Sequence, residues 1–296
     1  MSYNFAPPEE RETKADEKER LAKVDRQLGE LSRVTGNIRL YASSGIMEPV
    51  AAIAREHGLS VIAGAWVGED KDFSKRELDA VIRVANRNPN VRSIVIGNET
   101  ILRKELKVHE LIKMLRYVRR RVRVPVTTGE TWDIWLAHPE LVREVDYIAA
   151  HMLPYWEGIP SDYAATYAFK RYDELRRKFP GKRVVIAEFG WPSQGYNNRA
   201  AETGGLIQAQ VLREFIAEAN WRGVPYNVIE AFDQPWKANE GSVGAYWGLY
   251  DADGKPKFPL DGTVSQEYYP WRAGLGIVLG LIVTVFGLRR RRPTFL

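Results

Sequence analysis

The sequence predicts an α/β protein, a (β/α)8 TIM barrel followed by one C-terminal transmembrane helix. Three observations support this prediction. Apolar runs rich in β-branched residues alternate along the chain with longer amphipathic stretches, which is the pattern of repeated βα units. The length of 296 residues is close to the roughly 250 that one such barrel uses. A separate uncharged apolar segment lies near the C-terminus.

Each strand is expected where a short apolar run stops at a polar or turn-forming residue. We expect eight strands, at residues 2–7, 37–43, 60–67, 91–97, 125–130, 146–153, 183–189 and 227–232. Helices are expected between them, near residues 17–33, 46–58, 74–87, 104–121, 133–144, 163–179 and 201–222. Pro7 and Pro8 end the first strand, because proline cannot donate to a strand ladder.

The C-terminal segment has the features of a membrane span. Residues 273–288 hold no charge, three aromatic residues precede them, and Arg289–Arg292 follow. The stretch is somewhat shorter than the about 20 residues of a typical span, and a buried core helix is the alternative. The sequence therefore divides into a barrel at 1–262, a juxtamembrane linker at 263–272, a transmembrane helix at 273–288 and a basic cytoplasmic tail at 289–296.

Composition excludes several classes of function. The net charge is +5, but residues 271–296 hold five arginines and no acid, so the rest of the chain is near neutral and nucleic acid is not the expected partner. The chain has no cysteine, so it has neither disulfides nor a thiolate site. The four histidines show no HExxH or HxH spacing, which argues against a catalytic zinc ion. We expect no metal and no cofactor.

Two of the predicted strands end in a glutamate. Glu99 follows Ile94–Asn98, and Glu188 closes the run that begins at Val184. In a parallel α/β barrel the carboxyl ends of the strands form the floor of the active site, so these two carboxylates are expected to face one another. Such a pair is typical of glycoside cleavage. An ion pair of Glu99 with Arg39 or Arg92 is the structural alternative.

These motifs resemble glycoside hydrolase family 17, the β-1,3-glucanases and β-1,3-glucanosyltransferases. The resemblance covers roughly residues 2–260. It rests on Ile-Gly-Asn-Glu at 96–99 and Ala-Glu-Phe-Gly-Trp-Pro-Ser at 187–193. Three shorter motifs, at 39–41, 153–156 and 232–237, follow other strands in the same chain order. Gln234 stands where plant members often carry a glutamate, and this departure looks more like a bacterial membrane-associated branch.

The resemblance implies roles for individual residues. Glu99 would be the acid/base, Glu188 the nucleophile, Asn98 the ligand of the sugar 2-hydroxyl, and Tyr155 the hydroxyl that orients the nucleophile. Other candidate substrate contacts lie in the family motifs or at strand ends, namely Arg39, Tyr41, Glu130, Trp132, Trp156, Trp191, Glu230, Gln234, Trp236 and Lys237. Seven of the nine tryptophans fall at or beyond predicted strand ends, as sugar-stacking platforms or as caps of the barrel core. For Glu130 and Glu230 a structural ion pair is equally compatible with the sequence.

The predicted reaction is a retaining double displacement on β-1,3-glucan. We favour a glucanosyltransferase that cleaves and re-ligates glucan chains, with an endo- or exo-acting hydrolase as the alternative. A non-catalytic, membrane-anchored glucan-binding protein is a further alternative, which would not need both glutamates. The expected partners are glucan donors and acceptors, the membrane, and a glucan synthesis or export system.

The arginines after the apolar segment generate a prediction about location. Each costs roughly 2.5 to 3.5 kcal/mol at the centre of a span, so Arg289–Arg292 should stay in the cytoplasm and the barrel should lie in the periplasm of a bacterial inner membrane. Export needs a signal, so we expect the natural protein to carry an upstream signal or span. Protease added to intact spheroplasts should then cleave residues 1–270. If residues 1–270 are protected from the protease until the cells are lysed, the barrel lies in the cytoplasm and the predicted orientation is wrong.

Overall fold

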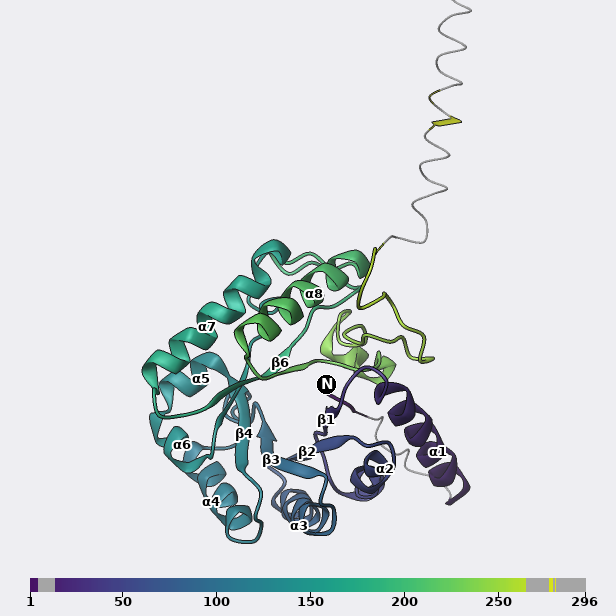
Figure 1. Ribbon diagram of the computed structural model, residues 1–296. Helices are drawn as coiled ribbons and strands as arrows, with labels where there is room; N and C mark the ends of the chain where they lie inside the picture. Colours follow the sequence, from purple (N-terminus) through teal and green to yellow (C-terminus); the bar gives the residue numbers. More distant parts are fainter. Residues whose placement is uncertain (5–13, 265–276, 279, 281–296) are drawn as a thin grey trace, which may run out of the picture. The chain divides into compact units, whose positions relative to one another are not determined.

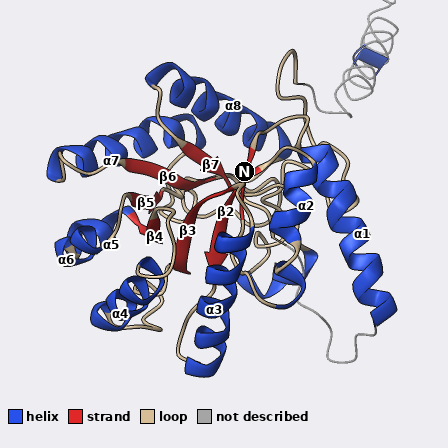
Figure 2. Ribbon diagram, turned by 60° about the horizontal axis from the view of Figure 1, so that its bottom comes forward, coloured by secondary structure: helices blue, strands red, loops and turns tan. Residues whose placement is uncertain are grey.

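The computed structural model describes residues 1–4, 14–264, 277–278 and 280. The chain divides into two units, Met1–Lys257 and Phe258–Leu296. The first unit is an α/β barrel, with strands in a central ring and helices on the outside (Figures 1 and 2). Its seven strands are all parallel and neighbour one another in sequence order, from β1 to β7.

The strands are close to the predicted ones and mostly shorter. They are β1 (Asn37–Arg39), β2 (Ser60–Ala65), β3 (Val91–Asn98), β4 (Val126–Thr131), β5 (Ile148–His151), β6 (Val184–Phe189) and β7 (Tyr226–Val228). β6 is buried at every position and β4 at all but its last, as expected for strands covered by helices on one side and by the barrel interior on the other.

The first predicted strand closes the ring without being a regular strand. Ser2 forms an isolated parallel bridge with Arg39 of β1, and its backbone N–H donates to the carbonyl of Val228 in β7 at 2.8 Å. Tyr3 N–H donates to Arg39 O, also at 2.8 Å. The remainder of this predicted strand, residues 5–7, lies outside the described residues. The N-terminal residues therefore occupy the place of an eighth strand between β1 and β7.

The helices follow the predicted order, with one difference. They are α1 (Lys14–Leu31), α2 (Val50–Glu56), α3 (Lys71–Arg87), α4 (Val108–Arg119), α5 (Trp132–Ala137), α6 (Pro139–Glu144), α7 (Ala164–Lys178) and α8 (Gly205–Arg222), with short 3₁₀ turns at Gly45–Met47, Ser161–Tyr163 and Pro235–Glu240. The single helix predicted at 133–144 is two helices. Pro139 is the cause, because a proline disfavours helical backbone at the preceding residue, and His138 has φ −123° and ψ 67°.

The predicted membrane helix at 273–288 lies outside the described residues, except for residues 277, 278 and 280. Within the part of the chain that the structure describes, no helix combines the length and apolar character needed to cross a bilayer.

Candidate active site

Both predicted catalytic glutamates lie at the carboxyl end of the barrel and line one cleft of about 730 Å³. Glu99 is the first residue after β3, and Glu188 lies within β6. An oxygen of each carboxylate lies within 4.8 Å of the other. The structure therefore brings together two side chains that are 89 positions apart in the sequence.

The turn after β3 fixes the position of Glu99. Gly97 has φ +76° and Glu99 has φ +58°, so the chain bends away from the strand through left-handed backbone. Glu99 N–H still donates to Gly129 O on β4, at 2.7 Å. The bend turns the strand end while the main chain stays attached to the sheet.

The buried Glu130 holds this turn. Its buried carboxylate accepts backbone N–H bonds from Ile101 at 2.8 Å and Leu102 at 3.3 Å, and a hydroxyl bond from Thr100 at 3.2 Å. It does not line the cleft. Burial raises its pKa, although these hydrogen bonds oppose the rise. The sequence left a subsite or an ion pair open for Glu130; the contacts are instead with the backbone that follows Glu99.

Glu188 is almost fully buried and is stabilised as an anion. Its Oε1 accepts a hydrogen bond from Arg39 Nη1 at 2.7 Å and another from Tyr41 Oη at 2.9 Å. Burial alone would raise the pKa of Glu188, but the charges of Arg39 and Lys237 and the hydrogen bond from the Tyr41 hydroxyl hold it below the usual value. A buried carboxylate that stays ionised is suited to act as a nucleophile.

Tyr41 takes the role that was expected of Tyr155. The Tyr155 hydroxyl donates to the backbone carbonyl of Tyr196 at 2.6 Å, and its ring packs edge-on against Trp191. Tyr155 is fully buried and does not line the cleft. The hydroxyl that contacts Glu188 comes from Tyr41, shortly after β1, so the assignment of this contact to Tyr155 is wrong.

Arg39 connects the two catalytic strands. Its side chain is 1% exposed, and besides Glu188 it donates to Ala187 O at 2.9 Å and to Asn98 Oδ1 at 2.8 Å. The ion pair that the sequence allowed between Arg39 and Glu99 forms with Glu188 instead. Since Arg39 occupies the oxygen of Asn98, the amide N–H₂ of Asn98 is the group available to a ligand in the cleft.

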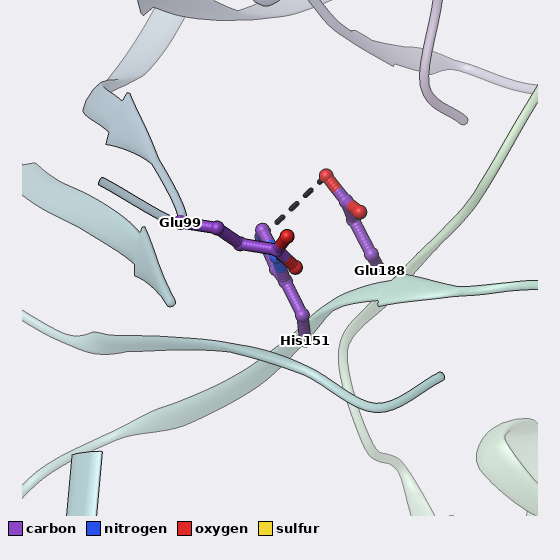
Figure 3. Close-up of side chains that lie close together, drawn as sticks. All are labelled: Glu99, His151 and Glu188. Atoms are coloured by element: carbon purple, nitrogen blue, oxygen red, sulfur yellow. Dashed lines mark hydrogen bonds and ion pairs between the residues drawn. The ribbon is translucent and has the colours of Figure 1, made fainter. Parts of the chain in front are cut away.

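His151 is the functional residue that sequence reasoning missed. It ends β5, is fully buried, and lies with Glu99 and Glu188 in one cluster (Figure 3). Its Nδ1 is 2.8 Å from Glu99 Oε1, and its Nε2 is 3.5 Å from Glu188 Oε1 and 3.4 Å from both terminal nitrogens of Arg39. The available signal was its place at a strand end, the same signal that identified Glu99 and Glu188.

Aromatic side chains form much of the cleft wall. Trp156 and Trp236 are 42% and 38% exposed, and Trp156 stacks on Trp247 with ring centroids 5.8 Å apart. Trp66 also lines the cleft, with the Arg103 guanidinium 4.8 Å from its ring centroid. Trp156 and Trp236, both predicted as substrate contacts, therefore lie partly exposed in the cleft wall.

Four other predicted contacts do not line the cleft: the buried Arg39, and Trp191, Trp132 and Gln234. Trp191 is fully buried, and its indole N–H donates to Glu202 O at 2.8 Å. Trp132 donates to Glu157 at 3.1 Å and has the Arg171 guanidinium 4.1 Å from its ring centroid. Gln234 accepts from the indole of Trp236 at 2.7 Å, so it positions a cleft residue.

Glu230 and Lys237 line the cleft as a buried ion pair. Lys237 Nζ donates to both carboxylate oxygens of Glu230, at 2.9 Å each, and its charge also favours the ionised form of Glu188. The ion pair that the sequence allowed for Glu230 is therefore present, and the role of this cleft residue as a substrate contact stays a prediction.

The cluster of Glu99, His151 and Glu188 also has the composition of a metal site. One ligand atom from each lies within 4.8 Å of the others. A cation bound there would have to displace the Arg39 guanidinium, which donates to the same Glu188 oxygen at 2.7 Å. The arrangement of these groups therefore suits proton transfer and anion stabilisation better than metal binding.

Comparison with known proteins identifies a family model that matches residues 4–248, described as the BtgE/BtgC glycoside hydrolase domain. A probable glucan endo-1,3-beta-glucosidase btgC from Aspergillus clavatus is 27% identical over 271 residues, which cover 80% of this chain and 39% of that protein. The chain thus spans about two fifths of that relative. A glucan 1,3-beta-glucosidase from Arthroderma benhamiae is 26% identical, with 78% of this chain and 81% of that protein covered.

The fold also matches solved structures. The glycoside hydrolase family 17 β-1,3-glucanosyltransferase from Rhizomucor miehei superposes with a TM-score of 0.77 at 23% identity, covering 88% of this chain and 97% of that one. An active-site mutant of that enzyme in complex with laminaritriose gives the same TM-score and coverage at 22% identity.

The contacts of Glu188 predict a change in pH dependence. Tyr41→Phe removes a hydrogen bond that lowers the pKa of Glu188, so this pKa should rise and less nucleophile should be ionised at low pH. A hydrogen bond to a charged group contributes about 1.5 to 3 kcal/mol, so the acid limb of kcat/KM on a glucoside should move up by roughly one to two pH units.

Tyr155→Phe is the matched control for this measurement, because it removes a hydroxyl bonded to Tyr196 O and leaves Glu188 untouched. Its acid limb should coincide with that of the unmodified protein. Equal shifts in both variants would mean that Tyr41 does not set the ionisation of Glu188.

Proposed function

Because this chain belongs to the family of BtgE/BtgC glycoside hydrolase domains, within glycoside hydrolase family 17, we propose that it acts on β-1,3-glucan with retention of anomeric configuration. The proposal rests on the short distance between two carboxylates that lie in different environments. Oxygens of Glu99 and Glu188 lie within 4.8 Å of each other. Retaining enzymes hold their two carboxyl groups about 5 to 5.5 Å apart, and inverting enzymes leave about 6.5 to 9.5 Å for a water molecule.

The environments of the two carboxylates support different roles. Glu188 is buried and kept anionic by Arg39 and Tyr41, so it attacks the anomeric carbon. Glu99 lies at the cleft with an 18% exposed side chain and gives its proton to the leaving oxygen. The bond from Glu188 to the sugar forms as the glycosidic bond breaks, and a glucosyl-enzyme results.

The second step reverses the role of Glu99. Its carboxylate now takes a proton from the acceptor, which attacks the glucosyl-enzyme and frees Glu188. A water acceptor gives hydrolysis, and a sugar hydroxyl gives transfer. Asn98 supports both steps, since its amide N–H₂ is available to the 2-hydroxyl while Arg39 holds its oxygen.

We favour transfer as the main outcome. Rings from separate segments line the cleft, with Trp66 after β2 and Trp156 after β5, which suits the binding of a second sugar chain as acceptor. The Rhizomucor miehei relative in fold is a glucanosyltransferase. The two curated relatives are called glucosidases, and hydrolysis therefore remains the alternative product.

We also propose that the barrel works in the periplasm of a bacterial inner membrane, tethered by residues 273–288. The support is the uncharged segment and the Arg289–Arg292 cluster of the sequence. A glucan synthesis or export system in the same membrane would then supply the donor chains.

Product analysis tests the proposed activity. The protein incubated with laminaripentaose should give both longer and shorter products, with the longer ones increasing as donor concentration rises. Shorter products alone at every concentration would indicate a hydrolase. Glu188→Gln should lose more than 99% of turnover yet still bind the oligosaccharide, and Glu144→Gln, on the outer helix α6, should match the unmodified protein. Binding without turnover in the unmodified protein would indicate a glucan-binding protein.

Chemical rescue tests the assignment of Glu99. Glu99→Ala should turn over a dinitrophenyl β-laminaribioside only slowly, because deglycosylation lacks its base, and added azide should accelerate it since azide needs no base. NMR should identify the product as a β-glycosyl azide. An α-configured azide would mean inversion and would overturn the role of Glu188.

A further inference from the structure

His151 touches both catalytic carboxylates, and its position has a specific consequence for Glu99. We infer that His151 is a positioning residue that keeps the catalytic proton of Glu99 on Oε2, the oxygen it does not contact. The inference rests on the proposed glycosidase function and adds a residue to that mechanism. It is argued from the tautomer of the ring, the packing around it and the two oxygens of Glu99.

The contacts of His151 Nε2 select the tautomer of the ring. Both terminal nitrogens of Arg39 lie 3.4 Å from Nε2, and a guanidinium can only donate. Nε2 therefore presents its lone pair. The other possible partner, Glu188 Oε1, is 3.5 Å away and already accepts from Arg39 and Tyr41. In the neutral ring the hydrogen then resides on Nδ1, which is 2.8 Å from Glu99 Oε1 and donates to it.

Packing leaves the ring little freedom to change this arrangement. His151 is fully buried at the end of β5. On β4, the neighbouring strand, Gly129 leaves room for it, because a Cβ there would lie 2.7 Å from His151 Nε2 and 3.0 Å from Arg39 Nη2. The ring is thus held between Arg39, Gly129 and Glu99, and its Nδ1–H bond has a fixed direction.

The fixed donor distinguishes the two oxygens of Glu99. Oε1 accepts the Nδ1–H bond, so a proton on Oε1 would meet another donor, whereas a proton on Oε2 leaves the bond intact. In the first step the Oε2 proton passes to the glycosidic oxygen as the bond to the anomeric carbon breaks and Glu188 bonds to that carbon. Oε2 takes a proton from the acceptor in the second step, and His151 keeps its own proton throughout.

Three substitutions separate the two sides of the ring. His151→Asn keeps an amide N–H close to the position of Nδ1, His151→Gln places its amide close to the position of Nε2, and His151→Leu keeps neither. Laminaripentaose needs protonation of its leaving group, whereas 2,4-dinitrophenyl β-laminaribioside does not, and kcat/KM reports the first step for both. His109→Leu, at an exposed histidine of α4, is the matched control.

We expect the Leu and Gln variants to lose about 100-fold in kcat/KM on laminaripentaose. On the dinitrophenyl substrate they should lose less than about 10-fold. The Asn variant should recover most of the loss, and the control should change neither value. Equal losses on both substrates, or an Asn variant as poor as the Leu variant, would overturn the inference. If the Leu variant does not fold, the comparison of Asn with Gln decides.

The tautomer can be read without any turnover. In ¹⁵N spectra of the unmodified protein, assigned by loss of signal in His151→Asn, the hydrogen of the neutral ring should lie on Nδ1. A hydrogen on Nε2 would overturn the inference even in an active enzyme. If the unmodified protein converts neither substrate, the proposed function fails, and the spectrum still decides whether His151 donates to Glu99.

Discussion

The buried guanidinium of Arg39 is the interaction on which the site depends. A charge inside a barrel is costly unless it is paired and hydrogen-bonded, and Arg39 meets this requirement with groups on two other strands: Glu188 and Ala187 O on β6, and Asn98 on β3. The same contacts orient Glu188 and Asn98, the residue next to Glu99. Burial opposes the charge of Arg39, and Glu188 is the main group that favours it, raising the pKa of Arg39. Each side chain of this ion pair is therefore stable only while the other is present.

Arg39 and its partners fit inside the barrel because glycines occupy neighbouring positions on the strands. A Cβ on Gly129 would collide with both His151 and Arg39, and a Cβ on Gly64 of β2 would lie 2.2 Å from Leu40 O. Glycine in a strand interior weakens the strand, and it persists where another group must approach closely. The sheet thus gives up local strand stability at Gly129 to allow contact between β1 and β5 through the barrel interior. A barrel with a larger residue there would have to separate Arg39 from His151.

The sequence predicts the barrel and its two glutamates well, because both follow from local patterns. A β-branched run that stops at a carboxylate places that carboxylate at a strand end, and parallel topology brings strand ends together. What local pattern cannot specify is which strand-end side chains touch. Tyr41 and Tyr155 both follow strands, and only the three-dimensional arrangement shows that Tyr41 reaches Glu188 while Tyr155 reaches Tyr196 O. Glu130 likewise ends a strand, but its side chain turns to backbone N–H groups beside Glu99.

The contacts of His151, like those of Tyr41, could not be predicted from local sequence pattern. Its partners Arg39, Glu99 and Glu188 are 112, 52 and 37 residues away, so no spacing rule connects them. The lack of HExxH or HxH spacing argues only against a zinc ligand. It says nothing about a histidine that acts as a hydrogen-bond donor, as His151 does to Glu99. A retaining glycosidase needs one carboxyl group that changes protonation state twice in each cycle beside one that stays ionised. Separate partners meet these opposite demands, because Arg39 and Tyr41 hold the charge of Glu188 while the His151 ring places Nδ1 2.8 Å from Glu99.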